Sequence, residues 1–314
     1  MNEYFLSRTD GYHKHELDSL GWEVTLSAML ESPKSPCRSV IRKNDSFGNL
    51  LYDFLCKVVP MDRIQSLLEI GGGYGYLMRD FLGQNRMMRA TMVDISPFLL
   101  KEQRKALDGF DVSFLEQDFF EIDDSVLLKV DLAILNEIMG DFPTACDIPR
   151  DLIIEGSTSG DGLLEEVLRI YSSYGLALPE RESFNLNLGA ILAVEKICTS
   201  QIPYVYLSEH SCEASVPQEL SRLLEIHSTG DPERIHLKGH DEYTVRFSDL
   251  EKVADFFGYK CQRGQYIDFI EPVIDGDLPF ILCLDSSKVE RYEIIRQFVE
   301  DLVKYEYIVL SLKS

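Results

Sequence analysis

The stretch SLLEIGGGYGYLMRDFL, residues 66–82, decides the fold of this chain. Its first five residues form a short apolar run with one acid, which is typical of a buried parallel strand. Four glycines, Gly71, Gly72, Gly73 and Gly75, follow at once, and apolar residues then recur at helical spacing. The stretch therefore predicts a strand, a glycine turn and a helix. Such a turn places bare backbone N–H groups at the positive end of a helix, where a ligand can approach closely.

The spacing of the glycines separates two ligand classes that use such a turn. A dinucleotide fingerprint, G-x-G-x-x-G or G-x-G-x-x-A, would put Tyr76 at its third position, where a large side chain obstructs packing of the helix on the strand. The chain instead has E-x-G-x-G-x-G, with Glu69, Gly71, Gly73 and Gly75. This pattern resembles the first motif of the class I S-adenosylmethionine (SAM) methyltransferases. A packing cluster of glycines in another α/β protein is the alternative, so the later strands must decide.

Three more predicted strands end in polar residues. Residues 91–93 lead to Asp94, about 20 residues after the glycines, where a doubly wound sheet holds a carboxylate that accepts both ribose hydroxyls. Residues 131–135 form a fourth strand that ends at Asn136 and Glu137. In SAM enzymes, which the chain resembles here, the residues that follow the third strand hold the adenine. In this chain they are Asp118 and Phe119. The residues expected at the SAM cofactor are Glu69, Gly71, Gly73, Gly75, Asp94, Ile95, Asp118, Phe119 and Asn136.

The composition excludes several functions. With 314 residues, 45% of them hydrophobic, and no window of about 18 apolar residues, the chain reads as a globular protein without a membrane span. A formal charge of −22 argues against nucleic acid as a partner, because phosphate binding needs clustered lysine and arginine. The seven scattered cysteines and the lack of a secretory leader predict reduced thiols in the cytoplasm and no metal site. The oligomeric state stays open, a homodimer included.

The expected fold class is α/β, a doubly wound Rossmann-like sheet of the class I methyltransferase type. Residues 1–60 are expected to form a helical N-terminal cover over the cofactor. Residues 61–143 and 201–314 form the SAM-binding domain, in which residues 279–284 are expected to be a strand. Residues 144–200, where the fifth strand fails to arrive, are expected to be a helical insertion that forms part of the substrate pocket.

Several stretches together resemble the MidA-type protein-arginine methyltransferases. LLEIGGGYGYLMRDFL resembles that family's E-x-G-P-G-R-G-T-L-M-x-D-L-L, and VDISPFLLKEQRKAL resembles its E-x-S-P-x-L-R-x-x-Q. NEIMGDFP resembles N-E-F-F-D-A-L-P. The chain departs from the family in the glycine turn, where Gly72 and Tyr74 replace a proline and an arginine, and at Gly140, where the family has an aspartate. The resemblance implies SAM as cofactor and a protein arginine as acceptor.

Glu137, Asn136 and His210 are the candidate catalytic residues. A carboxylate such as Glu137 can pair with a guanidinium and turn one of its nitrogens toward the methyl group, while Asn136 can fix the acceptor or the amino acid end of the cofactor. Asp141 is a weaker candidate, with a turn or cap residue as the alternative. His210, like His240, could be a base for a hydroxyl acceptor. Two other functions stay open: a small-molecule O- or N-methyltransferase, and an inactive assembly or binding factor that keeps the fold.

Overall fold

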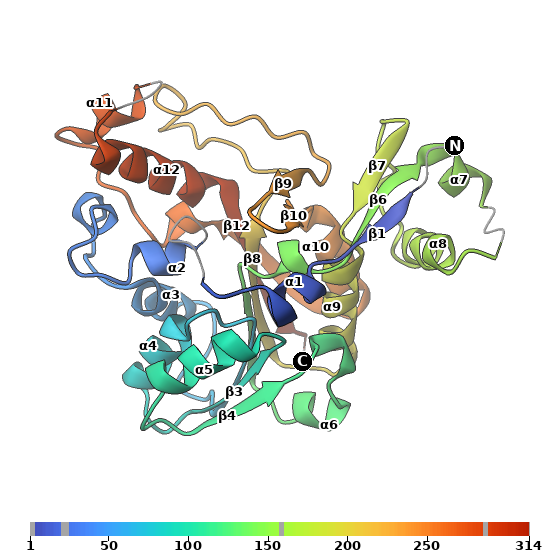
Figure 1. Ribbon diagram of the computed structural model, residues 1–314, viewed down its shortest axis with the longest axis horizontal. Helices are drawn as coiled ribbons and strands as arrows, with labels where there is room; N and C mark the ends of the chain where they lie inside the picture. Colours follow the sequence, from blue (N-terminus) through green and yellow to red (C-terminus); the bar gives the residue numbers. More distant parts are fainter. Residues whose placement is uncertain (1–3, 20–24, 157–159, 285–287, 314) are drawn as a thin grey trace.

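The computed structural model describes residues 4–19, 25–156, 160–284 and 288–313. Its main sheet has seven strands in the order β11-β12-β8-β5-β2-β3-β4 (Figure 1). Neighbouring strands from β8 to β4 are parallel, whereas β12 runs antiparallel to both β8 and β11. The bounds are β2 Ser66–Ile70, β3 Arg89–Asp94, β4 Val112–Glu116, β5 Leu132–Asn136, β8 Tyr204–His210, β11 Tyr259–Gln265 and β12 Tyr305–Leu312. The expected doubly wound α/β sheet is confirmed.

Helices cover both faces of this sheet, because its central strands are apolar on both sides. Alternate residues of β2 enter different cores: Leu67 packs in one and Leu68 in the other. Figure 1 shows α3, α4 and α5 on one side of the sheet and α9 and α10 on the other. The helices are α1 Asp10–His15, α2 Leu26–Met29, α3 Phe47–Leu55, α4 Tyr76–Gln84, α5 Pro97–Ala106, α6 Asp124–Leu127, α7 Arg150–Glu155, α8 Gly162–Tyr174, α9 Leu188–Thr199, α10 Phe247–Phe256, α11 Leu278–Leu282 and α12 Glu290–Lys304.

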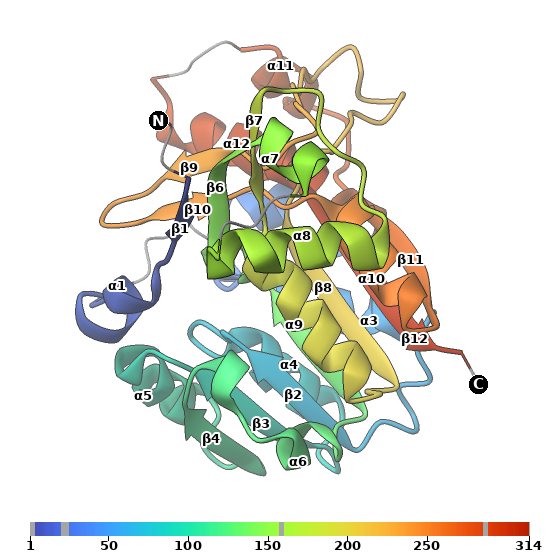
Figure 2. The same cartoon turned by 90° about the vertical axis from the view of Figure 1, so that its right-hand side faces the viewer.

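The N-terminal segment and the insertion share a small antiparallel sheet, which the sequence did not predict. Its strands β1 (Phe5–Ser7), β6 (Thr144–Pro149) and β7 (Ser183–Leu186) lie side by side, with β6 in the middle (Figure 2). Both segments had been expected to be helical, but each also contributes strands to this sheet. A separate hairpin pairs β9 (Arg234–His236) with β10 (Asp241–Tyr243).

Residues 279–284, expected to form a strand, fall largely in helix α11. Pro279 lies in the first turn of this helix, where its missing N–H has no helical partner to lose. Leu278, Ile281 and Leu282 are buried at helical spacing and belong to the core that contains α12. A run of six mostly apolar residues does not distinguish strand from helix, so this prediction was wrong. Within the described residues, no helix is long and apolar enough to cross a membrane.

Candidate functional site

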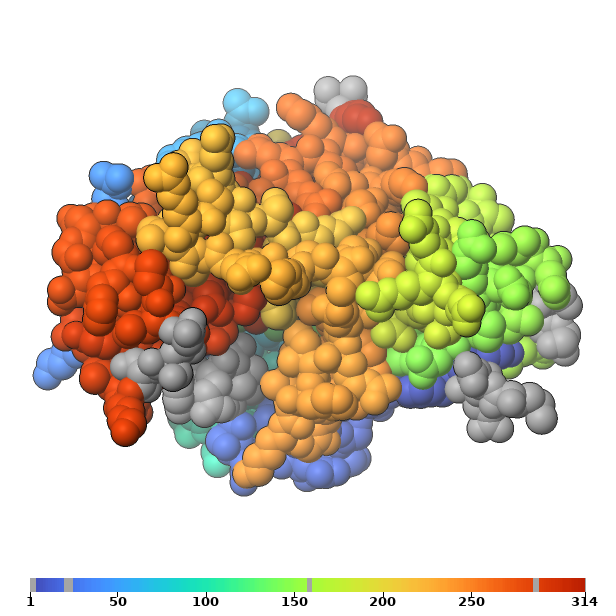
Figure 3. Space-filling view, turned by 90° about the horizontal axis from the view of Figure 1, so that it is seen from above, coloured from blue at the N-terminus to red at the C-terminus, as the bar shows by residue number. Residues whose placement is uncertain are grey.

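A cavity of about 680 Å³ lies at the carboxyl ends of β2, β3, β4 and β5. Ligands bind at this edge in such folds, at the point where the order of the parallel strands reverses. Two further segments complete its wall: residues 8–19 with 25–28, and residues 237–242 of the hairpin. No described residue of 144–200 lines the cavity, so the expected contribution of the insertion to this pocket is not found. In Figure 3 the orange hairpin lies against the blue N-terminal segment.

The glycine turn forms one side of the cavity, and its glycines are needed for packing as well as for access. Gly71 has φ +65°, and a Cβ atom there would lie 2.5 Å from Cγ1 of Ile138. A Cβ on Gly72 would lie 2.4 Å from Cε of Met92. Gly71, Gly72 and Gly73 line the cavity, whereas Gly75, with φ +81°, caps α4 and lies against α5 instead.

Asp94 ends β3 with its carboxylate at the cavity, as predicted. Oδ1 accepts a hydrogen bond from the Ser96 backbone N–H (2.9 Å), and Oδ2 accepts one from Nε2 of Gln103 (2.9 Å). Burial raises the pKa of Asp94 to about 6, although these two bonds act in the opposite direction. Each carboxylate oxygen has two acceptor sites, so each can still accept one hydroxyl.

Gln103 joins the glycine turn to this carboxylate. The Nε2 of this fully buried side chain also donates to the Gly73 carbonyl at 3.0 Å. We expect Gln103→Leu to weaken SAM binding about tenfold, because it leaves both acceptors without this donor and loosens the turn against Asp94. Isothermal titration calorimetry with SAM measures the change. Gln84→Leu, at an exposed position at the end of α4, is the control, and equal affinities for the two variants would contradict this role.

The remaining residues expected at the cofactor also reach the cavity. Oε2 of Glu69 is buried beside the glycine turn and has no hydrogen-bond partner among the described residues. Burial, and then the charge of Asp94, raise the pKa of Glu69 to about 8. Ile95, Asp118 and Phe119 line the far side, where Oδ1 of Asp118 accepts from the Phe120 backbone N–H. The cavity thus fits a polar ligand. It offers the unpartnered oxygen of Glu69, the bare backbone of the glycine turn and the carboxylate of Asp94.

Asn136 and Glu137 line the cavity but are already engaged by protein groups. Oδ1 of Asn136 accepts from Ser208 Oγ and from the Tyr266 hydroxyl, both at 3.0 Å. Oε2 of Glu137 accepts from the Leu26 backbone N–H at 3.1 Å, which ties α2 to the end of β5. Burial raises the pKa of Glu137 to about 8. A carboxyl held in this way at neutral pH is largely protonated, so it does not offer a charged fork to a guanidinium.

Glu137→Gln should therefore keep the fold and flatten the pH dependence of stability. The folded pKa of about 8 exceeds the ordinary value of 4.5, so this group stabilises the folded state at low pH. That contribution is lost as pH rises from 4.5 through 8. A glutamine amide keeps the bond from Leu26 without this loss. Thermal melting at pH 6 and pH 9 measures the effect, with Glu116→Gln at an exposed strand end as control. Equal changes of melting temperature between pH 6 and pH 9 in wild type and Glu137→Gln would contradict this prediction.

His210 does not line the cavity, so its position gives no support to a catalytic role. Successive side chains along a strand point to opposite faces, and it is Glu209 that reaches the cavity from β8. Oε2 of Glu209 accepts from the Gly140 backbone N–H at 3.0 Å. The ring of His210 stacks on Tyr305, with ring centroids 5.3 Å apart, and burial lowers its pKa to about 4.

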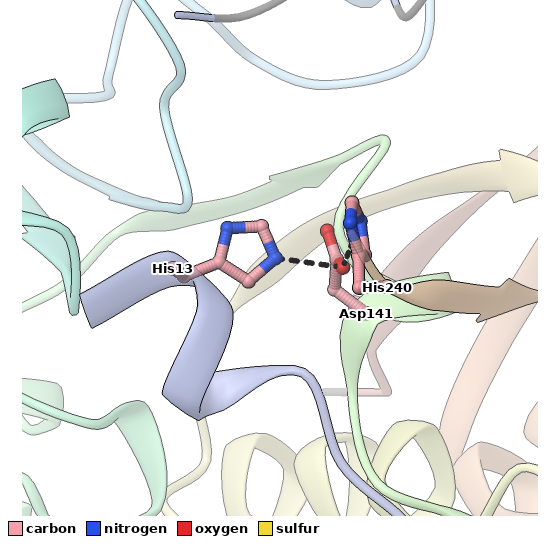
Figure 4. Close-up of side chains that lie close together, drawn as sticks. All are labelled: His13, Asp141 and His240. Atoms are coloured by element: carbon pink, nitrogen blue, oxygen red, sulfur yellow. Dashed lines mark hydrogen bonds and ion pairs between the residues drawn. The ribbon is translucent and has the colours of Figure 1, made fainter. Parts of the chain in front are cut away.

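A cluster that the sequence did not predict also lines this cavity. His13 of α1, Asp141 and His240 bring two imidazoles and a carboxylate together (Figure 4). Burial alone would raise the pKa of Asp141, but hydrogen bonds with His13 and His240 lower it to about 2. Burial disfavours the charged form of His240, but hydrogen bonds with Asp141 and Glu242 favour it. The net effect raises the pKa of His240 to about 9. Asp141 and His240 were separate candidates from the sequence, whereas His13 and Glu242 were missed altogether.

Comparison with solved structures agrees with this architecture. An uncharacterized COG1565 superfamily protein from Burkholderia thailandensis superposes with a TM-score of 0.53 and 13% identity, over 98% of this chain and 87% of that one. A second member of that superfamily from the same organism, solved with bound S-adenosylhomocysteine, gives 0.51 and 13%, over 84% of this chain and 76% of that one. The chain has the class I methyltransferase fold. No family model and no curated protein sequence matches it.

Proposed function

We propose that the protein is a SAM-dependent methyltransferase. The observation that carries the proposal is the order of groups around the cavity. The glycine turn follows β2, Asp94 ends β3, Asp118 and Phe119 follow β4, and Asn136 ends β5. Each strand thus supplies one polar group to the same crevice, as expected where a doubly wound sheet binds a nucleotide. One of the solved structures with a similar fold contains bound S-adenosylhomocysteine, which supports this assignment.

The cavity can hold each part of SAM with its own residues. Asp94 would accept the two ribose hydroxyls, and Asp118 with Phe119 would hold the adenine. The unpartnered oxygen of Glu69 and the glycine turn would face the amino acid end, whose ammonium needs an acceptor. SAM is a cation at its sulfonium, and the lining is rich in carboxyls, which favours a cation over an anion. The acidic residues of the lining are Asp10, Glu16, Asp18, Glu69, Asp94, Asp118, Glu137, Asp141, Glu209 and Glu242.

When bound, SAM supplies an activated methyl group, so the protein needs chiefly to position an acceptor and exclude water. Residues 8–19 and 25–28 would cover the crevice, as proposed for the N-terminal segment. The bond between Leu26 and Glu137 holds this cover at the end of β5. Glu137 would thus act by holding the cover, and Asn136 by fixing groups around the reacting atoms.

Two acceptor classes follow from the cavity. A protein arginine is supported by the resemblance to the MidA-type enzymes. A small molecule is supported by the volume of about 680 Å³, which lies in the range of small-ligand pockets. Only methyl transfer itself is common to both classes.

Turnover with labelled SAM tests the proposal and separates the acceptor classes. The purified protein is incubated with methyl-labelled SAM and a lysate separated into protein and small-molecule fractions. We expect label in one fraction and release of S-adenosylhomocysteine, with none from the Asp94→Asn protein. SAM binding by calorimetry without transfer to any fraction would favour an inactive binding factor. Absence of SAM binding would overturn the proposal.

A further inference from the structure

The cluster of His13, Asp141 and His240 directs several ligand atoms at one point. Nε2 of His13 lies 2.8 Å from Oδ1 of Asp141, and Nε2 of His240 lies 3.5 Å from the same oxygen. Nε2 of His240 also lies 3.2 Å from Oε1 of Glu242. Figure 4 shows the rings of His13 and His240 turned toward Asp141 from two different elements. Residues far apart in the sequence therefore place two nitrogens and one carboxylate oxygen within 4.8 Å of one another.

These side chains are held in place by their neighbours. The ring of Tyr12 stacks on that of His240, with centroids 4.4 Å apart and an angle of 20° between the planes. Gly239, at φ +99°, leaves room for Tyr12, since a Cβ there would lie 2.5 Å from its ring. The Thr9 hydroxyl donates to the backbone carbonyl of Asp141 at 2.7 Å and so ties the segment before α1 to it. The cluster is thus preorganised and does not depend on a single hydrogen bond.

The spacing fits a metal ion at the centre of the cluster. With metal–ligand bonds of about 2.1 Å, ligand atoms 2.8 Å and 3.5 Å apart subtend angles of about 85° and about 110° at the metal. Both angles lie near those of octahedral or tetrahedral sites. One ligand atom from each of the three residues lies within 4.8 Å of the others, so inward shifts of less than about 1 Å close the site.

We propose that His13, Asp141 and His240 bind a divalent transition metal ion in the wall of the cofactor cavity. Two imidazoles and one carboxylate suit zinc, cobalt, iron or manganese, whereas magnesium and calcium prefer oxygen ligands alone. The side chains of His13, Asp141 and His240 are only 11–13% exposed, which separates this site from the acidic clusters common on protein surfaces. The expectation of no metal site came from cysteine spacing and did not consider histidines from distant segments.

The site also suggests the acceptor class, and this step rests on the proposed function. The metal site and the cofactor residues line one cavity, so an open metal position would hold an acceptor oxygen beside the methyl group. The ion lowers the pKa of a bound hydroxyl, whose proton leaves to solvent. The oxygen lone pair then forms the O–C bond while the C–S bond breaks, and that electron pair stays on the sulfur. The acceptor would be a hydroxyl compound, not a guanidinium.

Metal binding by the full chain tests the site without any methyl transfer. The protein is dialysed against a chelator and then titrated with Co²⁺, whose visible absorption reports nitrogen and oxygen ligands, and with Zn²⁺ by calorimetry. We expect one equivalent to bind, and His13→Gln and His240→Gln each to weaken binding by at least about 100-fold, more than a lost outer-shell partner costs. His236→Gln is the matched control, because His236 pairs with Asp241 in the same hairpin but lies outside the cavity.

The outcomes separate the metal site from the proposed function. Failure to bind one equivalent, or equal affinities in wild type, His13→Gln and His240→Gln, would overturn the metal site. Far-UV circular dichroism of the same metal-free variants should match that of wild type and reports an intact fold. Loss of SAM binding with metal binding intact would refute the proposed function alone. Transfer to a hydroxyl acceptor should stop with chelator and return with metal, and transfer unaffected by chelator would overturn the acceptor assignment.

Discussion

Asp94→Asn should weaken SAM binding by at least about 100-fold. The carboxylate accepts from Ser96 and Gln103 and keeps one acceptor site on each oxygen for a ribose hydroxyl. An amide replaces one of these oxygens with a donor, which repels both a hydroxyl proton and Nε2 of Gln103. Two hydrogen bonds to a charged group contribute about 1.5–3 kcal/mol each, so a loss of about 3 kcal/mol is expected. Calorimetry with SAM measures it, and Asp108→Asn, at an exposed position after α5, is the control.

The pH dependence of SAM binding is a second test of Asp94, in which wild type is compared with the Asp94→Asn protein. The carboxylate form of Asp94 binds the hydroxyls, and its pKa is about 6. Affinity should therefore be full above pH 7 and fall as pH drops through 6, reaching about one tenth at pH 5. The Asp94→Asn protein has no carboxylate to protonate and should lose this part of the dependence. The same pH profile in both proteins would show that Asp94 does not contact the ligand.

Gly71→Ala should destabilise the fold by about 3 kcal/mol and abolish SAM binding at ordinary concentrations. An alanine at φ +65° costs about 1–2 kcal/mol, and the collision of its Cβ with Ile138 adds about 1–3 kcal/mol. Urea denaturation measures the free energy of unfolding. Gly83→Ala is the matched control: this glycine lies in α4, and a Cβ added to it would meet no atom within 4 Å, so alanine should stabilise by about 0.5–1 kcal/mol.

A second substitution separates the two causes of the damage at Gly71. In Gly71→Ala combined with Ile138→Ala, the two closest contacts, with Cγ1 and Cδ1 of Ile138, are gone, whereas the 3.2 Å contact with Cβ and the strained backbone remain. Compared with Ile138→Ala alone, the added alanine at position 71 should then cost about 1–2 kcal/mol. An unchanged cost of about 3 kcal/mol would show that Ile138 does not set the requirement for glycine.

The sequence brought Glu69, Gly71 and Asp94 to one cavity because their placement is local. Gly71 and Glu69 belong to one strand and turn, and Asp94 follows the next strand, so parallel pairing alone brings them to one edge. The histidine cluster was not predictable in this way. His13 and His240 are separated by more than 200 residues, and they meet around Asp141, with ring centroids 5.2 Å apart. Nothing in the spacing of histidines along the chain indicates such a contact.

Other differences have equally specific causes. The role expected of His210 depended on a side chain following β8, but the alternation of the strand gave that place to Glu209. The insertion at 144–200 was expected over the ligand because such insertions follow strand ends. It pairs with β1 instead, and the hairpin residues 237–242 take its place at the cavity.

The position of β12 has a consequence for how the protein is made. This strand follows every other strand in the chain, yet it pairs with β8 on one side and β11 on the other. Until residues 305–312 leave the ribosome, β8 therefore has one edge of unpaired backbone groups, and β11 has no partner. Exposed edges of this kind recruit other chains. Premature termination after β8 and before residue 305 should thus yield aggregates, even though the residues proposed to hold the cofactor, which end at Asn136, have already been translated.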